Sequence, residues 1–451
     1  MKRIVTTAAF AMVMAGQAQA QMPGAAPDPA HCAMMPEMCE AKPAATPDMA
    51  MPGMAMDHDH PMSMTHTGAL GAYPMTRDAS GTSWQPDASS HDALMTMRGD
   101  WMLMGHAVLN GVYDTQRGPR GDEKAFASGM AMGSASRAFA SGTTLQLRAM
   151  LSPDPLMGKR GYPLLLASGE TADGVKPLVD RQHPHDLFME LSASVSQRLS
   201  ERDSVFVYAG LPGEPAFGPP AFMHRASIMD SPEAPISHHW LDSTHITFGV
   251  LTAGYVHDRW KVEASRFRGR EPDEHRYDIE TGELDSTSAR LSWNPTNELA
   301  LQASWADVKS PEQLAPTEDQ TRYSASAMYT RDLGEGRSWS STLAWGRRTS
   351  DHHDLDAYAL ESAFKPSEAW TIFARAERTE NNELTSAIGG HGPTYNVGKA
   401  SLGAVRDFAV TEHASLGIGG LYAVNFTPSA LRAAYGDNAN GGMLFVRVKL
   451  H

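Results

Sequence analysis

The chain has 451 residues and a formal net charge of −14 at pH 7. The acidic balance argues against nucleic acid as a partner, because the phosphate backbone would repel it. After residue 20 no apolar run reaches the about 20 residues that a membrane-spanning helix needs, which excludes helical membrane spans. The length that remains is enough for one large β architecture or for two ordinary domains.

Residues 1–20 have the form of a secretory signal peptide. A basic start, Met1-Lys2-Arg3, is followed by an apolar run and by the small-x-small site Ala18-Gln19-Ala20. The apolar run ends too soon for a membrane anchor. We therefore predict export and cleavage after Ala20.

Residues 21–95 are dominated by Met, Pro, Ala, Asp and His, with few aliphatic β-branched residues. Such a composition buries too little apolar surface to offset the entropy of ordering the chain. The sequence therefore predicts a disordered N-terminal tract ahead of one large domain at residues 96–451.

Thioether, thiolate and imidazole side chains recur throughout this tract, in spacings such as Met49-Ala50-Met51. Thioether sulfur is soft and prefers Cu(I) or Ag(I), whereas imidazole also admits Cu(II), Zn(II) and Ni(II). A role as linker filler explains the methionines less well, because Met in a solvated segment gains nothing from packing. We predict that the tract binds copper, Cu(I) in preference to Cu(II). We also predict that the domain that follows needs no metal in order to fold. The predicted ligands are Cys32, Met34, Met35, Met38, Cys39, Met49, Met51, Met54, Met56, His58, His60, Met62, Met64 and His66.

Cys32 and Cys39 are the chain's two cysteines. In an oxidising compartment they could form one local disulfide, or they could remain thiolates and bind metal. Both alternatives stay open, and neither affects the predicted fold.

The run from Met56-Asp57-His58-Asp59-His60 to Met62-Ser63-Met64 resembles the tract at the start of the mature copper-resistance outer-membrane protein B family. The resemblance implies a Gram-negative outer-membrane barrel that binds or handles copper at its periplasmic side. It extends to the signal peptide and the general β pattern, and it assigns no barrel residue individually.

From about residue 101 the chain changes to short segments with apolar residues at every second position, which is the strand pattern. In the last segment Leu444, Val446, Val448 and Leu450 alternate with a partly cationic face. Alternation alone does not distinguish a soluble sandwich, whose apolar face points inward, from a membrane barrel, whose apolar face points to lipid.

Aromatic residues near strand ends, abundant small residues and strands that continue to residue 450 favour the barrel. We predict an all-β fold, an antiparallel up-and-down transmembrane β-barrel of 12 to 16 strands preceded by the disordered tract. The candidate strands are residues 101–113, 125–138, 143–151, 187–198, 203–211, 245–257, 260–268, 287–293, 299–307, 321–330, 338–349, 355–364, 370–379, 399–407, 414–425 and 442–450.

A His-rich stretch interrupts the strand pattern, and its loop at about 212–244 is stiffened by proline. Such loops can fold inward and constrict a barrel lumen. Its histidines could bind Cu(II) or Zn(II), or they could pin the loop to the wall, where an Arg181–Asp186 contact is equally conceivable. The weaker candidate ligands are His183, His185, His224, His238 and His239.

We predict an outer-membrane protein whose tract lies in the periplasm, and whose partners are outer-membrane lipid, copper or silver ions and a periplasmic copper-binding protein. The sequence contains no G-x-S-x-G, H-E-x-x-H or P-loop pattern, so no enzyme is predicted. Two alternatives remain: a general porin-like channel with an incidental tract, and a soluble periplasmic metal-dependent enzyme that uses the five histidines above.

Overall fold

The computed structural model describes residues 67–90, 93–385 and 392–451. The predicted signal peptide and every predicted ligand of the N-terminal tract lie outside these residues.

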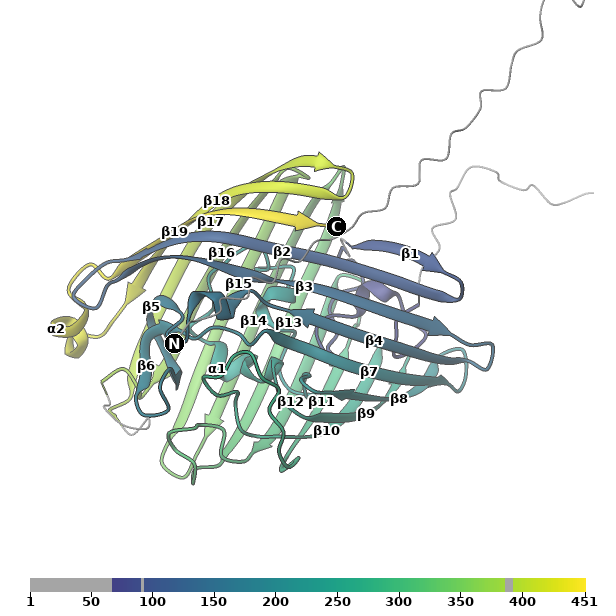
Figure 1. Ribbon diagram of the computed structural model, residues 1–451, viewed down its shortest axis with the longest axis horizontal. Helices are drawn as coiled ribbons and strands as arrows, with labels where there is room; N and C mark the ends of the chain where they lie inside the picture. Colours follow the sequence, from purple (N-terminus) through teal and green to yellow (C-terminus); the bar gives the residue numbers. More distant parts are fainter. Residues whose placement is uncertain (1–66, 91–92, 386–391) are drawn as a thin grey trace, which may run out of the picture. The chain divides into compact units, whose positions relative to one another are not determined.

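Sixteen antiparallel strands form a closed up-and-down barrel, shown in Figure 1. Strand β19 pairs with β2 and β9 pairs with β10, so the wall has no open seam. All 16 candidate segments correspond to barrel strands, which confirms the predicted fold class at the upper end of the expected strand number. The barrel strands are β2 (Trp101–Gln116), β3 (Glu123–Ala138), β4 (Thr143–Leu151), β7 (Phe188–Arg198), β8 (Asp203–Gly210), β9 (Val250–His257), β10 (Trp260–Phe267), β11 (Ser286–Trp293), β12 (Leu299–Val308), β13 (Gln320–Gly334), β14 (Arg337–Thr349), β15 (Asp354–Ser367), β16 (Trp370–Asn381), β17 (Tyr395–Thr411), β18 (Ala414–Phe426) and β19 (Asn440–Leu450).

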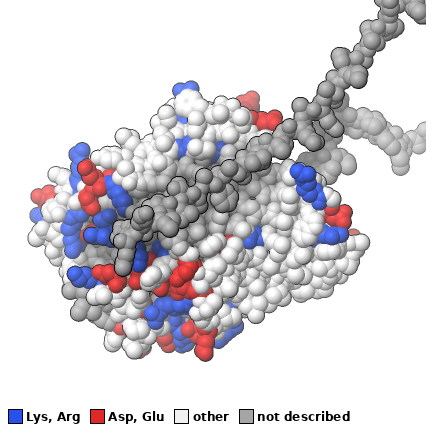
Figure 2. Space-filling model, viewed as in Figure 1, with Lys and Arg blue, Asp and Glu red and all other residues white. Residues whose placement is uncertain are grey.

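The outer face of the wall is apolar. On β19, Leu444 and Val446 are 68% and 58% exposed, whereas Met443 and Phe445 between them are buried at 2% and 3%. Aromatic residues such as Trp260 also lie on the outside. The face in Figure 2 is largely free of charged residues across its middle, and the charges gather toward its ends. The apolar face of the alternating strands therefore points outward, as a transmembrane barrel requires, and the soluble-sandwich alternative is wrong.

The two ends of the barrel differ in their connections. At the short-turn end the strands join by tight turns, such as the one in which Gly334 of β13 pairs with Arg337 of β14. At the long-loop end the connections are longer, and the largest span residues 152–187 and 211–249. None of the helices in the described part of the chain is long and apolar enough to cross a membrane.

A further strand, β1 (Leu94–Arg98), lies outside the closed ring. Leu450 of β19 pairs with Ala107 of β2, and beyond that point β1 takes over the same edge, with Leu94 opposite Gly105. The β1–β2 hairpin therefore lies at the short-turn end, near the C-terminus in Figure 1.

Three segments fill the barrel interior. The first, here called the plug, is residues 67–90 with η2 (Met75–Arg77). The second is residues 152–187, with η3 (Asp154–Met157), β5 (Tyr162–Thr171) and β6 (Pro177–Gln182). The third, here called the inner loop, is residues 211–249 and is almost wholly buried. It carries η4 (Phe222–His224), α1 (His238–Leu241) and η5 (Ser243–His245), while η6 (Ser429–Leu431) and α2 (Arg432–Tyr435) belong to the β18–β19 connection.

The folded plug corrects the predicted disorder of residues 21–95, which is wrong for residues 67–90. Tyr73 and Trp84 are buried at 4% and 3% and meet edge to face at 5.0 Å. They pack against Phe206 and Val256 of the barrel wall. The plug has too few apolar residues to form a core by itself, but the wall supplies the missing partners.

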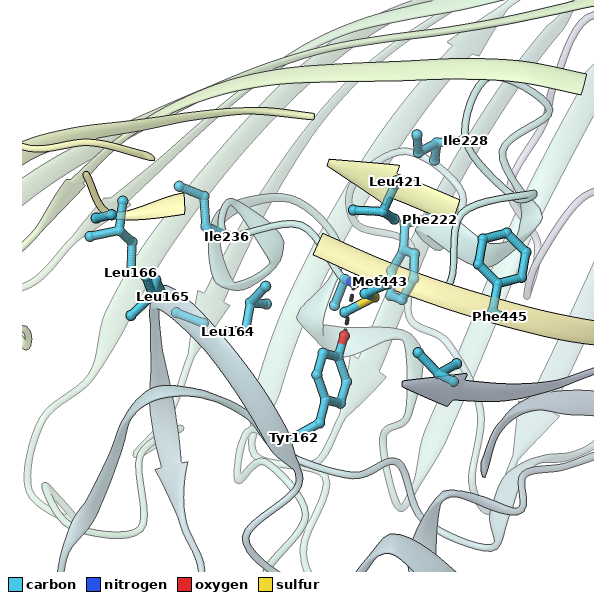
Figure 3. Packing of buried hydrophobic residues seen from close by; sticks show 14 of the residues in the cluster. Tyr162, Leu164, Leu165, Leu166, Phe222, Ile228, Ile236, Leu421, Met443 and Phe445 are labelled. Atoms are coloured by element: carbon cyan, nitrogen blue, oxygen red, sulfur yellow. Dashed lines mark hydrogen bonds between the residues drawn. The ribbon is translucent and has the colours of Figure 1, made fainter. Parts of the chain in front are cut away.

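The largest apolar cluster joins the second and third segments to the wall, as Figure 3 shows. The Tyr162 hydroxyl accepts a hydrogen bond of 2.9 Å from the backbone N–H of Ala234, which ties β5 to the inner loop. This packing holds the histidines of both segments at fixed positions. The cluster includes Tyr162, Leu164, Leu165, Leu166, Phe222, Ile228, Ile236, Leu421, Met443 and Phe445.

Candidate metal centre in the barrel lumen

The inner loop is clamped to the wall by a buried arginine. Arg225 donates from Nε and Nη2 to the two carboxylate oxygens of Glu361 on β15, at 2.7 and 2.6 Å. Its Nη1 donates to Asp242 at 2.5 Å. A two-pronged arginine–carboxylate contact fixes geometry more strictly than a single ion pair. Arg225 and Asp242 of the inner loop are therefore held at fixed positions against Glu361 of β15.

The Arg181–Asp186 wall contact considered above does not form. Arg181 pairs instead with Asp122 at 2.8 Å, and Asp186 pairs with Arg276 at 3.2 Å. Arg181 lies on β6 and its partner Asp122 is exposed, whereas Asp186 is buried.

Four buried histidines, here called the histidine core, converge from two segments. His183 and His185 follow β6, while His238 opens α1 and His245 ends η5. The ring centroids of His185 and His245 lie 5.2 Å apart, as do those of His238 and His245. Two imidazoles that share one ion in a tetrahedral site hold their centroids at about this separation, given a metal–nitrogen distance of about 2.0 Å.

Each anchored ring of the histidine core is held through its Nδ1 atom. His185 Nδ1 lies 2.8 Å from Asp154 Oδ2, and His245 Nδ1 lies 2.7 Å from the backbone oxygen of Asp242. The Nε2 atoms of both rings are buried and have no hydrogen-bond partner within the described ranges. Nδ1 anchoring with Nε2 left for the ion is how proteins orient histidine ligands.

Burial keeps three rings of the histidine core, His183, His238 and His245, neutral. Desolvation, reinforced by neighbouring positive charges, holds the pKa values of His183 and His245 well below their usual range. Burial also lowers the pKa of His238, although Asp242 opposes that shift. Metal binding requires the neutral form of imidazole, so these three rings are in the ligating state at neutral pH.

Two groupings of possible ligand atoms occur among the described residues, and the other one, Asp273, Glu274 and His275, is more exposed. The more buried grouping is a triad, here called the lumenal metal centre, made of His239, Glu271 and Glu312. One ligand atom from each residue lies within 4.8 Å of the other two. His239 Nδ1 and Glu271 Oε2 are 3.7 Å apart, which is too far for a hydrogen bond. These two atoms and Glu312 Oε1 are buried without a hydrogen-bond partner among the residues described. Glu312 Oε1 also lies 3.7 Å from Nη1 of Arg348. Buried polar atoms that lack hydrogen bonds are costly, and a bound cation would give all three a ligand contact.

Charge at the triad is unevenly distributed. Burial opposes ionisation of Glu271, but His239 and Arg322 outweigh it, so the pKa of Glu271 lies below its usual range. Burial, together with the charge of Glu271, raises the pKa of Glu312 to about 7. The pKa of His239 is raised because the Glu271 carboxylate overcomes the effect of burial. One ionised and one readily ionised carboxylate beside an imidazole make a ligand set for a divalent cation.

The centre borders a cavity of about 70 Å³ that Glu312, Glu170 and Gly169 help to line. Gly169 has φ +112°, and a Cβ atom there would lie 2.6 Å from Nε2 of His239. Only glycine therefore fits at this position without displacing the imidazole.

The centre also continues into the histidine core. The ring centroid of His239 lies 5.7 Å from that of His183 and 5.6 Å from that of His238. Imidazoles thus extend from the carboxylate-lined cavity into the middle of the barrel.

The structure brings together four of the five weaker candidate ligands, His183, His185, His238 and His239. His224 lies elsewhere, against His106 of β2, with a centroid separation of 6.4 Å. The sequence prediction missed His245, Glu271 and Glu312. The adjacent His-rich run was a signal for His245, but no spacing pattern marks the two glutamates.

No protein-family model matches the chain, and no curated protein matches it. Among solved structures, OmpF of Salmonella typhi in complex with daunomycin aligns over 79% of this chain and 100% of its own, with 12% identity and a TM-score of 0.49. OprB of Pseudomonas putida aligns over 77% of this chain and 94% of its own, with 9% identity and a TM-score of 0.47. OmpT of Vibrio cholerae aligns over 79% and 100%, with 10% identity and a TM-score of 0.44.

Proposed function

We propose that this chain is an outer-membrane copper-binding protein that supports copper tolerance. In this proposal the exported Met/His tract captures Cu(I) in the periplasm, and the lumenal metal centre binds Cu(II). The role is binding and control of passage rather than catalysis.

One observation carries the proposal: His239, Glu271 and Glu312 each offer a ligand atom within 4.8 Å of the other two, and each has a buried side-chain atom without a hydrogen-bond partner in the described ranges. Mixed imidazole and carboxylate ligands suit Cu(II), and Zn(II) is the nearest competitor. The adjoining histidine core adds neutral nitrogen ligands, which favour copper further.

Residence in the outer membrane is supported by the apolar outer face of a closed barrel, together with the predicted signal peptide. The resemblance of residues 56–64 to the copper-resistance outer-membrane protein B family supports the copper assignment. The tract itself, residues 21–66, lies outside the described residues, and its Cu(I) binding rests on the soft thioether ligands of the sequence.

A general porin-like channel is the second candidate. The plug, the segment 152–187 and the inner loop all occupy the lumen, so this barrel has far less free space than an open channel needs. We therefore favour a binding role over unrestricted diffusion.

The test combines tolerance and affinity in one set of full-length variants. Cells that lack the native protein would express the wild type, a deletion of residues 22–66, or His239→Ala/Glu271→Gln/Glu312→Gln. The matched control is His257→Ala/Glu201→Gln/Glu335→Gln, which changes the same residue types at exposed positions. We expect membrane-associated protein throughout and lower copper tolerance in both test variants. The affinity of the purified triple variant for Cu(II) should fall at least tenfold, with the control unchanged.

Two results would overturn this proposal. Wild-type tolerance and wild-type copper binding in both test variants would support the porin-like alternative. Recovery of the protein in the soluble periplasm would contradict the membrane location.

A further inference from the structure

A second cavity lies at the short-turn end of the barrel and is rich in methionine. It has a volume of about 110 Å³, and its lining includes Thr67, the first described residue of the plug. The volume is several times that of a water molecule, so an ion fits with room for side chains to close on it. Its soft and nitrogen ligands are Met75, Met102, Met104, Met132, Met229, His106 and His224.

Strand geometry concentrates these ligands on one patch of wall. Met102, Met104 and His106 alternate along β2, so their side chains share the inner face. Met132 of β3 is the direct cross-strand partner of His106. Directly opposed side chains in an antiparallel pair are neighbours, with Cβ atoms about 5 Å apart. His224 faces the same patch from η4, with its ring 6.4 Å from that of His106.

We propose that this methionine cavity is a binding site for a soft monovalent ion, Cu(I) or Ag(I), separate from the lumenal metal centre. Thioethers are neutral and soft, and they bind these ions while competing poorly for hard ones. Lys365, Lys449 and Arg148 line the cavity and outnumber its two carboxylates, Asp78 and Asp230. The excess positive charge repels a divalent cation twice as strongly as a monovalent one. The inference deepens the proposed function, since it assigns the two oxidation states of copper to two sites in the barrel.

The cavity is lined by the start of the plug and adjoins a second cavity that reaches the histidine core. Thr67 lines it, and Met62, Met64 and His66 immediately precede Thr67 in the sequence. On its other side, Val108 and Met229 are shared with a smaller cavity of about 50 Å³. That smaller cavity is lined by Met130 and Met223 and reaches His185 of the histidine core. The two cavities therefore give a soft ion a methionine-lined route toward the histidine core.

The test must separate this site from the tract. The background is the full-length chain in which every Met, His and Cys from 22 to 66 is changed to Ser. In that background, Met102→Leu/Met104→Leu/Met132→Leu removes three thioethers with little change in volume. Met328→Leu is the control, because Met328 is a buried methionine of the barrel wall that lies on β13 and does not line the cavity. Ag(I) serves as the probe, since it mimics Cu(I) and does not change oxidation state during the titration.

We expect the background chain to bind one equivalent of Ag(I), the Met328→Leu control to bind the same, and the triple variant to bind at least tenfold more weakly. His106→Gln, a single change that leaves the methionines in place, should also weaken binding. Equal Ag(I) affinity in the background chain and the triple variant, each showing heat-modifiable gel migration, would overturn the proposal. If the triple variant loses this migration, it has not folded, and the His106→Gln variant decides the test. An unchanged Ag(I) affinity of the His106→Gln variant would then overturn the proposal.

Cu(II) binding measured on the same samples keeps the two proposals distinct. Loss of Ag(I) binding with Cu(II) binding retained supports the methionine cavity as a separate site. Ag(I) binding in a chain that binds no Cu(II) would overturn the lumenal centre and leave the methionine cavity supported.

Discussion

His238 and Asp242 stand one helical turn apart, and Nδ1 of the histidine lies 2.8 Å from Oδ1 of the aspartate. The other carboxylate oxygen of Asp242 accepts from Arg225 at 2.5 Å. The same aspartate therefore orients one ring of the histidine core and, through Arg225, ties α1 to β15. The Arg225 charge and the hydrogen bond with His238 outweigh burial and hold the pKa of this carboxyl well below its usual range, so it stays ionised.

We predict that Asp242→Ala destabilises the barrel strongly, because it leaves the buried Arg225 charge with one partner fewer. Removing one member of a buried ion pair costs about 3–5 kcal/mol. The free energy of unfolding, measured by urea titration in detergent micelles, checks this. Asp437→Ala, which removes the exposed partner of Arg432, should cost no more than about 1 kcal/mol. Equal effects of the two variants would show that the network around Asp242 is not stabilising.

The plug is held by Arg77, which donates to both carboxylate oxygens of Asp87 at 2.6 and 2.8 Å and stacks over Trp84 at 4.7 Å. We predict that Arg77→Ala loosens the plug and gives the barrel a measurable ion conductance in planar bilayers. Wild-type protein and the exposed-site variant Arg432→Ala should conduct far less. Wild-type conductance as large as that of Arg77→Ala would contradict a closed lumen.

The positions of the barrel strands could be predicted from the sequence because each strand has one apolar face. Leu444 and Val446 mark β19 whether they face lipid or a packed core. Whether the apolar face points to lipid or to a core could not be predicted from β19 itself, because that depends on what occupies the other side of the wall. Here that side meets polar and apolar side chains of the plug and the inner loop.

The plug and the lumenal metal centre depend on tertiary structure. Tyr73 and Trp84 stand in a Pro-rich stretch whose own composition predicts disorder, and only the enclosing wall gives them a core. Glu271 and Glu312 come from separate connections, after β10 and after β12, and barrel curvature brings them to His239 of the inner loop. The His-rich run at 183–239 was visible in the sequence, but its carboxylate partners were not.

We predict that an arginine on the outer face destabilises the barrel according to its depth. Val446→Arg lies near the middle of β19 and should cost about 2–4 kcal/mol in lipid, whereas Leu450→Arg at the strand end should cost about 0–1 kcal/mol. Unfolding measured in lipid vesicles gives both values. Two equal, small costs would contradict a lipid-facing outer surface.

Glu214 of the inner loop predicts a pH dependence of stability. Burial, only partly offset by Arg290 at 3.8 Å, raises its pKa to about 7. The folded state therefore binds this proton more tightly than the unfolded state, whose pKa is near 4.5. The contribution of Glu214 to the free energy of unfolding is fully present below pH 4.5 and is lost as the pH rises to 7, a change of about 3 kcal/mol.

Glu214→Gln should remove this pH-dependent contribution to stability. The stability of the wild type relative to the variant should fall between pH 4.5 and pH 7 and then level off, as measured by urea unfolding at a series of pH values. Glu335→Gln, at an exposed turn, should give a parallel pair of curves. Parallel curves for Glu214→Gln as well would contradict the raised pKa.

The most direct test of the lumenal metal centre is electron paramagnetic resonance of the full-length protein loaded with one equivalent of Cu(II). The account predicts a spectrum with mixed nitrogen and oxygen ligation. The nitrogen hyperfine pattern should change in His239→Ala, and the g and copper hyperfine values should shift in Glu271→Gln. Spectra of both variants that overlay the wild-type spectrum would contradict it.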